Sequence, residues 1–88
     1  MIEYIYDIIK ATKGEQVAAK ITDDAGQVVR EQCYFHLFQE GEMKVEVSGL
    51  LVDDVWYFAI PDIAPGRYDY CFGTADKSLC FKKPFYLK

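Results

Sequence analysis

Three cysteines and a single histidine are the side chains of this sequence best suited to covalent or metal chemistry. With the last turn centred on Ala75–Asp76, Cys71 is expected opposite Cys80, and such a cross-strand pair forms a disulfide where its geometry is suitable. With His36 on a neighbouring strand, the same thiols offer zinc ligands. No CxxC pair or other zinc spacing is present, however, and the number of cysteines is odd. The simplest interpretation is therefore reduced, half-buried thiols and a solvated histidine, as in proteins made in a cytoplasm.

Other routes to catalysis lack the residues that they need. A serine or cysteine nucleophile requires a nearby base, and His36 is the only histidine. The acid pairs at 23–24 and 53–54 lie in expected turns, where adjacent side chains point apart, so neither pair is expected to act as a general acid and base. The six glycines are isolated and form no phosphate-binding loop. We therefore expect no enzyme activity, no catalytic residue, no cofactor and no bound metal.

Composition and charge describe one globular domain spanning residues 1–88. Apolar residues make up 51% of the chain and aromatic residues 16%, well above the content of disordered chains. The net charge is −4 and the basic residues are scattered, which argues against a nucleic-acid partner. No apolar run approaches about 20 residues, so no membrane span is expected. The initial MIEYIYDIIK lacks the basic segment and cleavage site of a signal peptide.

Alternating apolar and polar residues predict β-strands throughout the chain. Residues 4–10 are apolar on both faces and are expected to form one strand, although their spacing also suits a helix over residues 3–10. Between turn signals rich in Gly, Asp and Pro, further strands are predicted at 16–22, 33–39, 43–47, 55–60, 68–72 and 78–87, and a short extended piece is expected to begin at 28–29. About seven short strands at this spacing indicate a β-sandwich or a small barrel.

The segment PDIAPGRYDYCFG, residues 61–73, predicts a corner that leads into a strand. Pro65–Gly66 suits a turn, because Pro fixes φ and Gly tolerates conformations that other residues avoid. Tyr68 follows at the position where a tyrosine corner buries its ring and donates its hydroxyl to upstream backbone. In the expected hairpin register Tyr70 faces Phe81. The predicted core comprises Val17, Ala19, Ile21, Phe35, Leu37, Val45, Trp56, Phe58, Ile60, Tyr68, Tyr70, Phe72, Leu79 and Phe81.

Two segments contain more apolar side chains than one core face can accept. If Cys33, Phe35 and Leu37 point into the core, the residues between them point outward, and segment 4–10 has a similar excess on the face opposite Ile5 and Ile9. Contiguous exposed apolar patches mark association sites. The predicted partner-binding residues are Tyr4, Tyr6, Ile8, Tyr34, His36 and Phe38.

The second half of the chain resembles the small immunoglobulin-like domains of tailed-phage and prophage virion proteins. The resemblance lies in WYFAIPDIAPGRYDYCF at 56–72 and in LCFKKPFYL at 79–87. It implies an all-β, immunoglobulin-like antiparallel β-sandwich of about seven strands. It also implies a non-enzymatic role in the virion, as capsid decoration or as a tail or baseplate accessory, for a protein made in the bacterial cytoplasm.

The partners expected from this resemblance are other virion proteins or further copies of the chain, with no nucleic acid and no membrane. An alternative from another class is a bacterial immunoglobulin-like module that binds a carbohydrate or peptide through Tyr34, Phe38 and loop residues.

Overall fold

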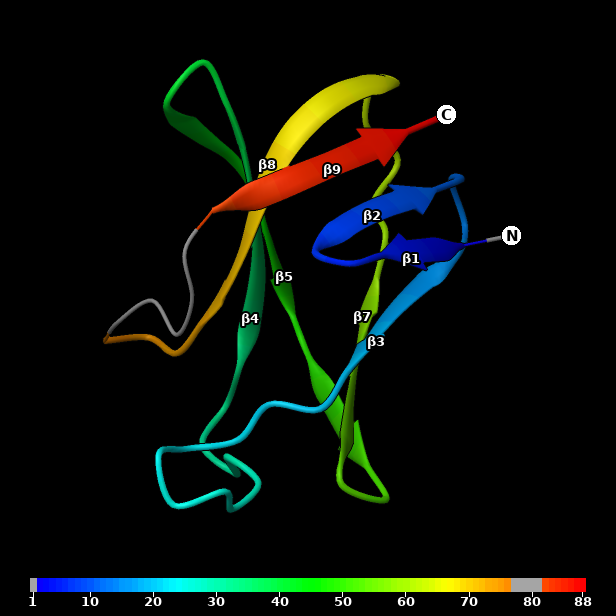
Figure 1. Cartoon of the computed structure of the whole chain (residues 1–88). Helices are drawn as coiled ribbons and strands as arrows, with labels where there is room; N and C mark the ends of the chain where they lie inside the picture. The colour runs from blue at the N-terminus through cyan, green and yellow to red at the C-terminus, as the bar shows by residue number, and fades with distance from the viewer. Residues whose placement is uncertain (1, 77–81) are drawn as a thin grey trace.

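The computed structural model describes residues 2–76 and 82–88, which form nine β-strands and no helix. The strands make two sheets that face one another (Figure 1). The six-stranded sheet has the order β1 (Glu3–Ile5), β2 (Ile8–Ala11), β9 (Lys83–Leu87), β8 (Gly66–Gly73), β4 (Tyr34–Gln39) and β5 (Glu42–Ser48). The three-stranded sheet has the order β3 (Gln16–Ala19), β7 (Val55–Ala59) and β6 (Leu50–Val52). The prediction of an all-β fold is confirmed, and the alternative helix over residues 3–10 is wrong.

The core lies between the two sheets, where alternate residues of each strand meet. The fully buried ring of Phe35 joins the layers, with ring centroids 5.9 Å from Phe58 and 5.7 Å from Phe85. Of the predicted core, Leu79 and Phe81 lie outside the described residues. The others are buried or partly buried: Val17, Ala19, Ile21, Phe35, Leu37, Val45, Trp56, Phe58, Ile60, Tyr68, Tyr70 and Phe72.

The predicted tyrosine corner is confirmed. Tyr68 is 5% exposed, and its hydroxyl donates to the carbonyl oxygen of Ala64 at 2.7 Å. This bond ties the start of β8 to the loop that crosses between the sheets. Trp56 fixes a second loop in the same way, because its Nε1 donates to the carbonyl oxygen of Val29 at 2.8 Å.

The N-terminal segment differs from the predicted single strand. It folds back on itself, with Ile5 paired with Ile8 across a two-residue turn, so that β1 and β2 form a hairpin. The φ of Tyr6 is 55°, a left-handed value that reverses the chain at a point the alternation does not reveal. β2 then pairs in parallel with β9, so the sheet is not wholly antiparallel as predicted.

A second unpredicted element arises at Gly49, where the sequence suggested that a strand ends. The chain instead passes from β5 in one sheet to β6 in the other. A Cβ atom at position 49 would lie 2.5 Å from Cε1 of Phe58, so only glycine lets the backbone cross so close to the core. With the extra hairpin, this element gives nine strands in the described residues where about seven were predicted.

The register predicted for the last hairpin is wrong by two residues. Tyr70 pairs with Lys83 and not with Phe81. Pro84 pairs with Asp69, and the ladder to β2 starts one residue later at Phe85. β9 therefore has an open edge on the β2 side at Pro84, which is consistent with its missing N–H group.

Candidate functional site

The outer face of the six-stranded sheet carries a band of side chains that runs across every strand. Phe38 of β4 pairs with Met43 of β5 on one side and with Asp69 of β8 on the other. Asp69 in turn pairs with Pro84. On β2, Ile9 and Ala11 are buried in the core, so Ile8 points outward and meets its partner Ile5. We call this band the outer row; its members are Met43, Phe38, Asp69, Pro84, Ile8 and Ile5.

The outer row is apolar apart from one carboxylate. Met43 is 53% exposed and Ile5 is 40% exposed, while Phe38, Pro84 and Ile8 are half-buried. The side chain of Asp69 lies 3.6 Å from that of Arg67 in an exposed ion pair. An apolar band of this kind is more typical of a protein-contact surface than of a solvated sheet face.

β4 presents the three outward residues that the sequence predicted, with Phe38 in the outer row and Tyr34 and His36 beside it. His36 stacks on Tyr34 at a centroid distance of 6.3 Å and meets the edge of Phe38 at 6.2 Å. Nε2 of His36 lies 2.9 Å from a carboxylate oxygen of Glu46, and Nζ of Lys82 sits 4.0 Å above the Phe38 ring. Their predicted outward orientation is confirmed, and two of the three rings, those of His36 and Phe38, have a charged neighbour.

The three N-terminal residues predicted for the same site do not share a face. Ile8 joins the outer row. Tyr4 turns toward the other sheet, where its hydroxyl accepts a hydrogen bond of 2.9 Å from the backbone N–H of Ala18 on β3. Tyr6 occupies the hairpin turn and is 99% exposed. The cause of this correction is the turn at residues 6–7, which reverses the alternation on which the prediction relied.

A second apolar face was missed by the sequence reasoning. On the outside of the three-stranded sheet, Leu50 is 66% exposed and Val52 is 44% exposed. They pair with Tyr57 and Val55 of β7, which are half-buried. The signal was present in the alternation of LLVDDVWY, because a two-residue Asp-Asp turn places these four residues on one face.

The described residues do not bring the cysteines together in a metal site or a catalytic site. Cys71 is fully buried, where a half-buried thiol was expected; its predicted partner Cys80 lies outside the described residues. Sγ of the buried Cys33 donates to the carbonyl oxygen of Glu31 at 3.4 Å, and burial raises the pKa of this thiol. A protonated, enclosed thiol is a poor nucleophile.

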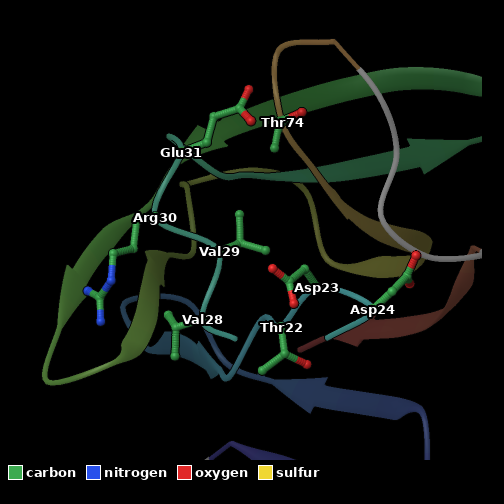
Figure 2. Close-up of a pocket in the computed structure, with 8 residues that line it drawn as sticks. All are labelled: Thr22, Asp23, Asp24, Val28, Val29, Arg30, Glu31 and Thr74. Atoms are coloured by element: carbon green, nitrogen blue, oxygen red, sulfur yellow. The ribbon is translucent and has the colours of Figure 1, made fainter. Parts of the chain in front are cut away.

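One hollow, of about 390 Å³, is lined by the 22–31 loop and Thr74 (Figure 2). Its acids do not converge: Oδ1 of Asp23 accepts the backbone N–H groups of Ala25 and Gln27, both at 2.9 Å, and Asp24 points elsewhere. Within residues 2–76 and 82–88, no His, Cys, Asp and Glu side chains are grouped to hold a metal ion.

Comparison with known proteins gives no match to a family model, to a curated protein or to a solved structure. The part of the chain that the structure describes includes no helix with the length and apolar character needed to cross a bilayer.

Proposed function

We propose that this domain has an immunoglobulin-like topology. Its strand order supports the assignment: β3-β7-β6 faces β5-β4-β8-β9, which corresponds to strands B-E-D facing C′-C-F-G, with β2 beside the last strand. The tyrosine corner at the start of β8 occupies the position that it has in such sandwiches. The tryptophan lies on β7 and not on the strand equivalent to C, which is a departure from antibody domains.

On this scaffold we propose a non-enzymatic function in protein–protein association, as a structural or accessory subunit of a phage or prophage virion. The observation that carries the proposal is the outer row, which places exposed and half-buried apolar side chains, from β1 at one edge to β5 at the other, on one sheet face. The particle itself is suggested by the resemblance of segments 56–72 and 79–87 to virion domains. A pre-formed sheet face buries apolar area on a partner with little rearrangement.

Assembly into particles tests this function. Met43→Asp places a carboxylate in the outer row on an exposed side chain, so it should leave the fold intact and reduce incorporation of the domain into purified virions. Leu50→Asp is the matched control, since Leu50 is still more exposed, at 66%, but lies on the opposite sheet. Circular dichroism verifies that both variants fold. Equal incorporation of both variants, or absence of the wild-type domain from particles, would contradict the proposal.

The alternative function is carbohydrate or peptide binding by Tyr34 and Phe38. A glycan or peptide array distinguishes it from the virion role. Two contacts count against it: Nζ of Lys82 lies over the Phe38 ring, and the Tyr34 ring stacks on His36. Sugar-binding aromatic residues need an open ring face. Specific retention of a glycan, lost in Tyr34→Ala, would favour this alternative over the virion role.

A further inference from the structure

We propose that two copies of this chain form a closed dimer through their β1–β2 hairpins, with Tyr6 of each copy seated in a hollow on the other. The inference rests on the proposed function only in treating the outer sheet face as a protein-contact surface. It adds the identity of one partner, a second copy, and the residue that makes the central contact.

Tyr6 has an unfavourable backbone conformation, and its side chain gains no burial within the domain. Its φ of 55° lies in the left-handed region, which bulky side chains rarely adopt, and glycine would occupy this turn without strain. The side chain is 99% exposed, so it contributes no burial to the domain. Glu40, Asp53 and Asp54 occupy the other hairpin turns with similar φ values, so what sets Tyr6 apart is a large aromatic ring left open to solvent. A contact outside the chain accounts for a tyrosine at this position.

The turn that carries Tyr6 is held firmly. The hydroxyl of Tyr70 donates to the backbone carbonyl oxygen of Asp7 at 2.8 Å, and Nζ of Lys83 lies 3.2 Å from the Asp7 carboxylate. Immediately before and after the turn, Ile5 and Ile8 pair across the hairpin. Tyr6 is therefore presented on a pre-organised support, which lowers the entropic cost of binding.

A hollow of about 450 Å³ lies along the same hairpin, from Ile8 beside the turn to Glu3 and Lys10 at the other end, and its chemistry complements the turn. It is lined by Glu3, Ile8, Lys10, Tyr86 and Lys88. The apolar side chains can receive an aromatic ring, and the carboxylate can accept its hydroxyl. The two lysines are opposite in charge to Asp7, whose side chain is 70% exposed beside Tyr6. The volume is sufficient for a tyrosine side chain.

The positions of the turn and the hollow allow both contacts to form at once. Figure 1 shows the turn between β1 and β2 at the end of the hairpin away from the two chain termini, whereas the hollow includes Glu3 and Lys88 near those termini. The far end of the hollow, at Glu3 and Lys10, lies roughly 10 Å along the strands from the turn. Two hairpins placed antiparallel about a two-fold axis therefore exchange both tyrosines and bring Ile5, 40% exposed, close to the axis. Such an isologous contact closes as a dimer and does not propagate.

Sedimentation over a wide range of protein concentration tests the dimer. Wild-type protein should pass from monomer to dimer with no larger species. Tyr6→Gly should weaken the dimer about tenfold or more, as expected for an aromatic hot spot, and should not destabilise the fold, because glycine suits the φ at this position. Leu50→Ser, on the opposite sheet, should dimerise like the wild type. A wild-type protein that stays monomeric, or an unweakened Tyr6→Gly dimer, would overturn the proposal.

A charge exchange tests the direction of the contact. Asp7→Lys and Lys10→Glu should each weaken the dimer, and the double variant should recover much of the loss because the opposed charges are restored. No recovery in a folded double variant would overturn the proposed seating of Tyr6. Failure of either dimer test would not decide the particle test, because Met43 lies at the end of the outer row opposite the hairpin turn.

Discussion

At the scale of single residues, the hydroxyl of Tyr68 is the clearest stability determinant that can be tested in isolation. Tyr68→Phe keeps the buried ring and removes only the 2.7 Å hydrogen bond to Ala64. Loss of this bond leaves a carbonyl oxygen without its donor, so we expect a loss of about 1 kcal/mol in the free energy of unfolding. Urea denaturation gives this quantity, and Tyr86→Phe, at an exposed tyrosine of β9, serves as the control. Equal stability of Tyr68→Phe and wild type would show that the corner bond does not contribute.

The residues that the sequence predicted well are those whose roles depend on near neighbours. The inward positions of Phe35 and Leu37 follow from alternation along one strand, and Tyr68 follows from the Pro-Gly turn two residues earlier. Tyr6 was wrongly placed on a strand face, because no glycine or asparagine marks its left-handed φ. Cys71 was expected to be half-buried, yet it is 2% exposed on the outward side of a strand flanked by two neighbours.

At the scale of elements, the turn between β4 and β5 offers a direct gain in stability. Gln39 pairs with Glu42, and the two loop residues Glu40 and Gly41 have φ values of 54° and 80°. Both values fit a type I′ turn, which prefers Asn-Gly. We therefore expect Glu40→Asn to raise the free energy of unfolding by about 0.5 kcal/mol, measured by thermal and urea denaturation.

The matched control for this turn is Gly41→Ala. No atom lies within 4 Å of a Cβ at position 41, so any loss must come from the backbone conformation alone. A loss of about 1 kcal/mol is expected for a non-glycine residue at this φ. If alanine were tolerated without loss, or asparagine gave no gain, the assignment of the turn would be wrong.

At the crossing from β5 to β6 a substitution is expected to destabilise the fold through side-chain packing, and not through φ as in the turn. In Gly49→Ala the new methyl group would meet Phe58 and also Cε3 of Trp56, at 2.7 Å. Both rings are buried and cannot move aside cheaply, so we expect a loss of about 2–3 kcal/mol. Ser48→Ala, one residue earlier and exposed, should change stability little. A Gly49→Ala protein with wild-type stability would show that the sheets can separate at this crossing.

Element boundaries were predicted well where Pro or Gly marks the end of a strand, and they were missed where the sequence has no clear signal for a tight turn. Pro61 and Gly66 bracket the corner between β7 and β8 close to its observed limits. β6 was not predicted, because Gly49 was taken as the end of a strand, whereas it lets a strand change sheets. The register of the last hairpin depends on a connection that turn signals alone do not define.

At the scale of the whole molecule, alternation specifies two buried layers but not the order of strands within them. The parallel contact between β2 and β9 joins residues from opposite ends of the chain, such as Ile9 and Phe85. No local pattern encodes that contact. The outer row is invisible in the sequence for the same reason, because its members come from six strands and become neighbours only through register.

The position of Phe35 between the two sheets leads to a prediction about how the whole domain unfolds. The ring of Phe35 on β4 contacts aromatic residues of both sheets, with centroid distances of 5.4 Å to Phe72 and 5.9 Å to Phe58. Phe35→Ala should therefore cost about 3–5 kcal/mol, a large part of the 5–15 kcal/mol usual for a small domain. Phe35→Leu should cost less, because it retains most of the buried volume.

Because the same ring joins the two sheets, both variants should still unfold in a single cooperative transition. Far-ultraviolet and near-ultraviolet circular dichroism should then report the same midpoint in urea. Two separate transitions, or a Phe35→Ala protein as stable as the exposed control Leu50→Ala, would show that the sheets are stabilised independently. In that case the six-stranded sheet would support its outer row without the three-stranded sheet, and the domain would not act as one rigid body in binding.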